Sequence, residues 1–482
     1  MAPSFLPRRR PAGIAFDTSD AVIDRFVRSL RASGPRPLAV ASPTTEAQVD
    51  RLVEWANDHD VPLVPVSSPQ GPRLRGDTQP TRPAVVVDLS AMRRVLHIDG
   101  RDRIAVIEPG VTFDALDDAL RPHGLRSFRP LRPRQGKSVL GAYLEREPTT
   151  SPNEHWDTTD PLASLSITFG SGEHFRTGGG ALPGTLEENL RRGNRQMMAS
   201  GPMVTDYSRV LLGAQGTLGI VSWASLYCEP IPASEAPCLF GADDYRAVAE
   251  LARRLLLRQL GAQCFLLDRV QFAALLADDA ASFERLHAGA AGPRWLLYVN
   301  LSAADYLPDQ RMAWQRRDAE ALARQAGAVP QAETYALSAE ALARRLRRSS
   351  PSPYQDTPRG MHREVFCLTQ LDRVPALLDR IGPLLAGLGP VLHGVYVQPT
   401  VQGASCHLCV TLFHGPAQGA AVAAIEARLV TTLAEGGGFF SRPYGPWAEV
   451  AYARDSAIVP HLRKVKQLFD PKGLLNPGRL CF

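Results

Sequence analysis

The feature that most constrains the fold is a glycine-rich turn followed at once by an apolar segment, in residues 211–232 (LLGAQGTLGIVSWASLYCEPIP). Three glycines, Gly213, Gly216 and Gly219, occupy the turn, and residues 220–226 have the composition of a β-strand. Because glycine has no Cβ, backbone N–H groups of such a turn can closely approach a flat or phosphorylated ligand. Ordinary turns before strands have the same pattern, but the motifs elsewhere in the chain favour a ligand site.

A helix–strand unit nearer the N-terminus leads to a second loop of this kind. Thr45 and Gln48 fit a capping box, apolar residues then repeat with helical period, and a strand is expected at residues 61–66. The following loop, SSPQGPRLRGD at residues 67–77, can aim N–H groups and positive charge at a pyrophosphate. A surface loop with solvated arginines is the alternative. The candidate phosphate-binding residues of this loop are Ser67, Ser68, Gly71, Arg73 and Gly76.

The segment patterns predict an α+β protein of two domains and a tail. Short strands, short helices and glycine turns fill the first half, with strands expected at residues 84–89, 104–108 and 165–169. The second half reads as helices packed on one antiparallel sheet, with helices at 245–260, 309–326 and 338–348 and strands at 295–301, 391–397 and 405–413. Residues 349–363 are expected to form a long loop. The expected boundaries are 1–235, 236–454 and 455–482.

Composition excludes several classes of protein. The 482 residues are 44% hydrophobic and 21% charged, which is typical of a globular chain of two or three domains. A net charge of +5 gives no indication of nucleic-acid binding. No membrane span or signal peptide is expected, because long apolar runs are missing. Seven cysteines without framework spacing indicate reduced thiols in a cytoplasmic protein.

Five motifs occur in an order that resembles the vanillyl-alcohol oxidase/p-cresol methylhydroxylase family of FAD enzymes. They are IEPGVTFDAL at 107–116, KSVLGAYLER at 137–146, EHW at 154–156, RTGGGALPG at 176–184 and LGIV at 218–221. FDPKGLLNPGRL at 469–480 matches as well. The resemblance implies a two-part FAD-binding domain, a cap domain over the isoalloxazine and a C-terminal tail that returns to the FAD domain. The sequences of the SVLG and GALP motifs are closer to those of the phenol-oxidising branch than to those of the D-lactate/glycolate branch.

The resemblance also implies which residues contact the FAD. Besides the loop residues named above, these are Pro109, Gly110, Lys137, Ser138, Val139, Gly141, Gly213, Gly216, Gly219, Ile220, His407 and Asn476. Some oxidases of the family attach flavin covalently at or next to the position of His407, so a covalent link stays open. In the D-lactate branch the same strand carries a metal-binding histidine, and a satisfied buried histidine is the third interpretation. No catalytic metal is expected, because the acidic motif of the metal-using branch reads RPYG at 442–445.

Three departures from the family pattern bear on the chemistry. Prolines and Gln70 replace the adjacent glycines of the pyrophosphate loop. The segment before SVLG reads RPRQGK, without the carboxylate of the phenol-oxidising branch, so the expected flavin-side acid is missing. The tyrosine–arginine pair that grips phenolate reads Ser441–Arg442, with Tyr444 as a partial substitute.

Arg442, Tyr444 and His407 are the catalytic candidates. A guanidinium stays charged, so beside a flavin Arg442 would favour an anionic substrate, either a phenolate or a carboxylate. A structural ion pair at a domain edge is the alternative role for Arg442. On strand 405–413, Cys406 and Cys409 point to opposite faces, and His407 shares its face with Cys409.

The sequence therefore predicts an FAD-dependent oxidoreductase that transfers hydride from a small, para-substituted phenol-like substrate to flavin N5. A D-2-hydroxy-acid dehydrogenase of the same fold is the first alternative. The second is a non-catalytic subunit of a larger redox complex, suggested by the altered loop and the missing carboxylate. The expected partners are the substrate, an electron-acceptor protein (a cytochrome or iron–sulfur subunit) and further copies of the chain in an oligomer.

Overall fold

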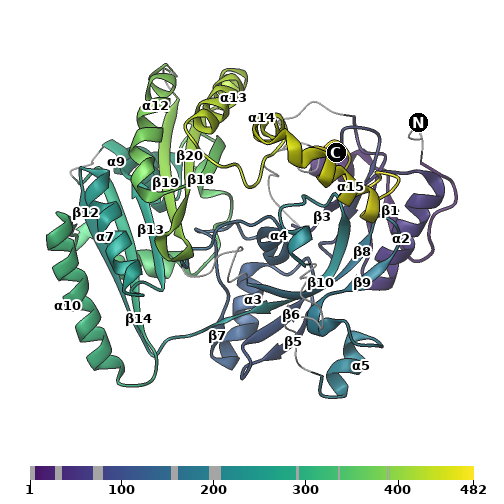
Figure 1. Cartoon of the computed structure of the whole chain (residues 1–482), viewed down its shortest axis with the longest axis horizontal. Helices are drawn as coiled ribbons and strands as arrows, with labels where there is room; N and C mark the ends of the chain where they lie inside the picture. Colours follow the sequence, from purple (N-terminus) through teal and green to yellow (C-terminus); the bar gives the residue numbers. More distant parts are fainter. Residues whose placement is uncertain are drawn as a thin grey trace.

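The computed structural model of the protein describes residues 6–27, 35–68, 80–152, 161–194, 208–288, 292–334, 337–387, 389 and 391–482. Gly71, Arg73, Gly76 and the EHW motif at 154–156 lie outside the described residues. Figure 1 shows two lobes, the N-terminal half on the right and the cap on the left, with the C-terminal tail returning to the N-terminal lobe.

A four-stranded sheet begins the N-terminal lobe, in the order β1–β2–β4–β3. Its elements are β1 (Ala15–Asp17), α1 (Asp20–Val27), β2 (Ala39–Ser42), α2 (Glu46–His59), β3 (Leu63–Val66) and β4 (Val85–Asp88). The Oγ1 of Thr45 accepts from the Gln48 backbone N–H at 3.3 Å and caps α2 as predicted. The Gln48 side chain accepts from the N–H of Thr44 instead of Thr45, so the predicted capping box is only half formed.

The second sheet is antiparallel, in the order β5–β6–β10–β8–β9, and β10 (Gly219–Tyr227) is its central strand, as the apolar segment predicts. The other elements of this part are β5 (Val95–Asp99), β6 (Ile104–Ile107), α3 (Phe113–Leu120), β7 (Leu125–Arg126), α4 (Val139–Leu144), β8 (Leu162–Phe169), β9 (His174–Arg176), α5 (Leu186–Arg191), α6 (Ser208–Leu211) and β11 (Glu229–Pro230). Apolar side chains of β6, α3, α4, β8 and β10 form one core. The ligand-facing turn before β10 is thereby fixed to a rigid sheet.

The cap is a seven-stranded antiparallel sheet in the order β15–β12–β14–β13–β19–β20–β18. Its strands are β12 (Ser234–Ala242), β13 (Gln263–Asp268), β14 (Trp295–Ala303), β15 (Val329–Pro330), β18 (Met361–Thr369), β19 (Leu392–Thr400) and β20 (Ser405–His414). Its helices include α7 (Tyr245–Leu257), α8 (Arg269–Leu276), α9 (Ala280–Ala288), α10 (Pro308–Ala326), α11 (Ala339–Leu346), α12 (Val374–Ala386) and α13 (Gly419–Glu435). The strands β12, β13 and β18 were not predicted from the sequence. Because β18 begins at Met361, the loop predicted at 349–363 is shorter than expected, and it contains a 3-10 turn at Tyr354–Asp356.

The C-terminal tail joins the N-terminal lobe through its backbone. After α14 (Trp447–Arg454) and α15 (Val459–Phe469), the Leu63 N–H donates to the Leu474 carbonyl at 2.9 Å and the Asn476 N–H donates to the Leu63 carbonyl at 2.8 Å. These bonds place the Asn476 backbone beside the first residue of β3. Within the described residues, no helix is long and apolar enough to cross a membrane. All seven cysteines are described, and none forms a disulfide.

A contact between His174 and two carboxylates, between α2 and the β8–β9 hairpin, makes the stability of the fold depend on pH. His174 lies 3.0 Å from an Asp50 oxygen and 3.2 Å from a Glu46 oxygen, and these hydrogen bonds raise its pKa from 6.5 to about 9. This stabilisation is fully present below pH 6.5 and is lost as the pH rises through about 9.

The raised pKa of His174 should make the wild type lose about 1–3 kcal/mol of unfolding free energy between pH 6.5 and pH 9. We expect His174→Gln to lack this loss. Urea unfolding at several pH values measures this. His123→Gln, at an exposed histidine, is the control. Parallel pH profiles for wild type and His174→Gln would contradict the prediction.

Candidate functional site

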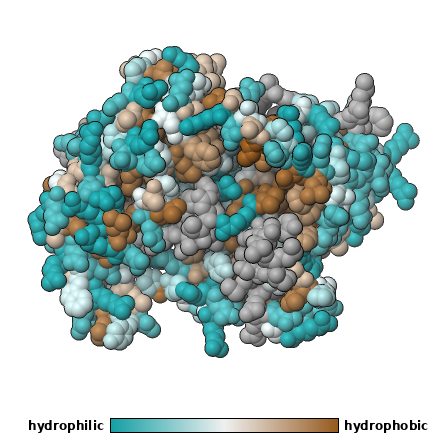
Figure 2. Space-filling model, viewed as in Figure 1, coloured by the Kyte–Doolittle hydropathy of each residue, from teal (hydrophilic) through white to brown (hydrophobic). Residues whose placement is uncertain are grey.

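A cavity lies between the cap sheet and the N-terminal lobe, and side chains of both line it. Figure 2 shows apolar side chains gathered near the centre of the view, between the lobes. From the N-terminal lobe come the end of β3, the start of α4 and the turn before β10. From the cap come β18, β19, β20 and the segment that carries Arg442 and Tyr444. A cavity of this kind is the ordinary place for a small-molecule site, because two rigid bodies supply opposite walls.

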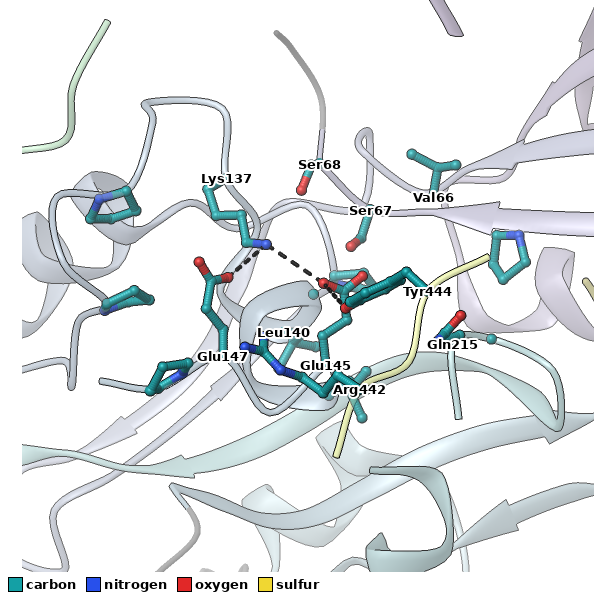
Figure 3. A pocket seen from close by; sticks show the side chains of 18 of the residues that line it. Val66, Ser67, Ser68, Lys137, Leu140, Glu145, Glu147, Gln215, Arg442 and Tyr444 are labelled. Atoms are coloured by element: carbon teal, nitrogen blue, oxygen red, sulfur yellow. Dashed lines mark hydrogen bonds and ion pairs between the residues drawn. The ribbon is translucent and has the colours of Figure 1, made fainter. Parts of the chain in front are cut away.

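The start of α4 is built so that backbone and small side chains face the cavity. The Oγ of Ser138 accepts from the Gly141 N–H at 2.9 Å and donates to the Pro109 carbonyl at 2.6 Å. Gly141 lines the cavity, and a Cβ there would lie 2.8 Å from the Oγ of Ser67. Ser67, Ser68 and Lys137 line the same wall, as Figure 3 shows. This wall therefore leaves room for a ligand against the backbone.

The turn before β10 forms the opposite edge of this wall. Gln215 and Gly216 both have left-handed backbone angles, with φ of 53° and 68°. Gly216, Gly219 and Ile220 line the cavity. A side chain at Gly219 would place its Cβ 2.4 Å from Ile167, so only glycine fits this position.

The structure separates the predicted cofactor residues into two groups. Ser67, Ser68, Pro109, Lys137, Gly141, Gly216, Gly219, Ile220, His407 and Asn476 line the cavity. The second group supports the walls from behind: Gly110 packs against the Ser90 carbonyl, Gly213 donates to the Leu144 carbonyl, and Ser138 and Val139 are fully buried at the start of α4.

Asn476 presents a buried acceptor to the cavity. Its Nδ2 donates to the Gln215 carbonyl at 2.7 Å, while its Oδ1 has no hydrogen-bond partner among the described residues and the side chain is 4% exposed. A buried amide oxygen without a partner is costly, so this oxygen fits a ligand with an N–H donor. The edge of an isoalloxazine ring supplies such a donor.

The cap wall is largely aromatic. Tyr354, Phe366 and Tyr396 line it, together with His407 and Cys409 of β20. His407 and Cys409 thus share the cavity face, as predicted from strand alternation. Burial raises the pKa of Tyr354 and of Tyr396 above the usual range, which keeps both phenols neutral.

Arg442 is a buried cation at this wall. Its side chain is 2% exposed, its Nη2 lies 3.1 Å from the Nε2 of His407, and its Cζ lies 4.3 Å from the ring centroid of Phe366. Among the described residues, no carboxylate pairs with Arg442, and its Nη1 has no hydrogen-bond partner. A buried guanidinium without a counter-ion favours an anion in the cavity.

Three carboxylates that were not predicted from the sequence line the cavity: Glu145, Glu147 and Glu364. The Oη of Tyr444 donates to Glu145 at 3.3 Å, and the Nζ of Lys137 lies 2.7 Å from Glu147 and 3.8 Å from Glu145 (Figure 3). Glu364 lines the cap side and accepts from Gln355 at 3.0 Å. The segment before SVLG lacks an acid, but the site does not, because α4 turns the chain back toward the cavity at Glu145. The motif LERE directly after α4 was the available signal.

Comparison with known families matches both halves of the chain. Residues 37–178 match the FAD binding domain model, and residues 231–480 match the model of the C-terminal domain of FAD linked oxidases. Among curated proteins, mitochondrial D-lactate dehydrogenase (cytochrome) of Arabidopsis thaliana is 25% identical over 225 residues, which is 46% of this chain and 36% of that protein. Four such relatives are matched over only 34–37% of their own length.

Two solved structures share the fold over nearly their whole length. The 4-ethylphenol oxidase of Gulosibacter chungangensis superposes with a TM-score of 0.80 at 19% identity, covering 96% of this chain and 93% of that one. A p-cresol methylhydroxylase with substrate bound gives a TM-score of 0.79 at 16% identity, covering 97% and 94%. The predicted fold, a two-part domain with a cap and a returning tail, is confirmed.

Proposed function

The chain belongs to the FAD-linked oxidases and is an FAD-dependent oxidoreductase, and we propose that it oxidises a small, para-substituted phenol-like substrate bound as an anion. The supporting observation is Arg442, a buried guanidinium in the cavity with no carboxylate partner among the described residues. The aromatic wall of Tyr354, Phe366 and Tyr396 suits a flat ring.

The residues of the cavity divide between cofactor and substrate. When bound, FAD supplies the hydride acceptor of the reaction. Ser67, Lys137, Gly141 and Asn476 would hold it against the N-terminal lobe. On the cap side Arg442 would bind the substrate oxyanion and hold the ring in place, which keeps the reacting carbon in one orientation.

Proton transfer is assigned to the Tyr444–Glu145 pair. Tyr444 donates to the Oε2 of Glu145, so this carboxylate can take a proton that the substrate hydroxyl releases on binding. The Nζ of Lys137 lies 3.8 Å from the same carboxylate and helps to hold it in place.

Oxidation of a D-2-hydroxy acid is the alternative, with Arg442 holding the carboxylate. The Arabidopsis relative, named a D-lactate dehydrogenase, supports it. Anaerobic mixing with 4-ethylphenol or with D-lactate separates the two functions. We expect bleaching of the flavin absorbance by the phenol at a rate at least about tenfold above that with the hydroxy acid, a difference of about 1.4 kcal/mol in barrier. The reverse order would replace the first proposal with the second.

The purified protein's visible spectrum tests whether the chain is catalytic at all. We expect flavin bands. A colourless protein that cannot be reconstituted with FAD would support the non-catalytic subunit.

We further propose the domain division 1–235, 236–454 and 455–482, which is supported by the change from the two N-terminal sheets to the seven-stranded sheet at β12.

A protein electron acceptor, a cytochrome or iron–sulfur subunit, is proposed because the Arabidopsis relative is named for a cytochrome. We also propose an oligomer and, from the cysteine pattern of the sequence, a cytoplasmic location.

A further inference from the structure

The contact between Arg442 and His407 fixes the protonation of the histidine. The Nη2 of Arg442 lies 3.1 Å from the Nε2 of His407, and both side chains are buried. A guanidinium carries only donors and does not lose its proton. Nε2 must therefore accept, which makes His407 neutral with its proton on Nδ1.

The surroundings hold this arrangement. His407 packs against the rings of Phe366 and Tyr396, with centroid distances of 5.1 Å and 6.3 Å. Arg442 contacts the same aromatic cluster, because its Cζ lies over the ring of Phe366. An imidazolium here would place two cations and two facing donors together, which the low dielectric of a buried site makes costly. The buried surroundings therefore favour neutral His407 with its proton on Nδ1.

In this tautomer neither ring nitrogen of His407 has a free lone pair, because Nε2 accepts from Arg442 and Nδ1 carries the proton. We propose that His407 is a positioning residue for Arg442: its Nε2 holds one guanidinium nitrogen so that Nη1 is directed to the anionic group of the substrate. This rests on the proposed function of Arg442. Because a bond from His407 to flavin needs a free imidazole lone pair, the contact at Nε2 and the proton on Nδ1 together keep the FAD free of a covalent link to His407.

The flavin arm of the test uses the wild-type holoenzyme. After acid precipitation, we expect the yellow flavin in the supernatant. Flavin that stays with the pellet, and moves to the supernatant in His407→Gln, would overturn the proposal.

The substrate arm measures binding of 4-nitrophenol, whose absorbance reports the bound phenolate. His407→Leu and His407→Phe lack the acceptor, and we expect each to raise the Kd about tenfold or more, because one charge-assisted hydrogen bond is lost. His407→Gln, whose Oε1 can accept from Arg442, should restore the Kd to within about threefold of wild type. His414→Leu, at a buried histidine at the far end of the same strand, is the matched control and should bind like wild type.

The variants separate this proposal from the proposed function. If Arg442→Met weakens 4-nitrophenol binding but His407→Leu and His407→Phe do not, the positioning role is wrong and the role of Arg442 stands. If Arg442→Met binds like wild type, the anion-binding role of Arg442 is wrong, and the positioning role is wrong with it. Two acceptor-free variants are used so that misfolding of one, seen as lost flavin, does not decide the result.

Discussion

Arg442→Met is expected to lower kcat/KM for the preferred substrate by about 10²–10³-fold while the flavin content stays that of wild type. Methionine fills a similar space but removes the cation that we propose to face the substrate oxyanion from the cap wall. The buried site makes that charge strong, because little water screens it. Steady-state kinetics and the ratio of flavin to protein absorbance measure the two effects separately.

Arg442→Lys is the matched variant for this prediction. It keeps the charge but loses the planar fork that contacts His407 and Phe366 together. We expect an intermediate loss of about tenfold. Equal kinetics for wild type and Arg442→Met would show that Arg442 has a structural role only.

Asp470→Ala should destabilise the protein by about 3–5 kcal/mol, the largest stability effect that we expect from a single substitution. Asp470 is 1% exposed, accepts from the N–H groups of Leu474 and Leu475 at 3.0 Å and 2.8 Å, and pairs with the Nζ of Lys466 at 2.5 Å. Its removal leaves Lys466 as a buried cation without its carboxylate. Burial already lowers the pKa of Lys466, and Asp470 opposes that shift.

Urea unfolding measures the loss, and Lys472→Ala is the control. Lys472 forms an exposed ion pair with Asp60, and we expect its loss to change stability little because water screens the pair. Because Asp470 holds the turn that leads to Asn476, Asp470→Ala should also retain less flavin. Similar losses for Asp470→Ala and Lys472→Ala would contradict the assignment of Asp470 as the anchor of the tail.

Local sequence patterns predicted those helices and strands whose geometry depends on residues nearby in the sequence. The Thr45 cap and the apolar spacing of α2 depend on residues within one or two turns, so the helix was predictable. The strands β12, β13 and β18 were not. The segment QCFLLD of β13 is a short apolar run buried in the middle of a sheet, and such a run has no alternation that distinguishes a strand from a buried helix.

The site divides in the same way. The turn before β10 was predictable from local sequence, because Gly213 and Gly216 adopt left-handed backbone angles that other residues rarely adopt. The chemistry of the cavity depends instead on contacts between segments that are far apart in the sequence. Arg442 meets His407 across 35 residues, and Tyr444 meets Glu145 across 299. A backbone angle is set by the residue that adopts it, whereas the partner of a buried charge is set by which distant segments pack together.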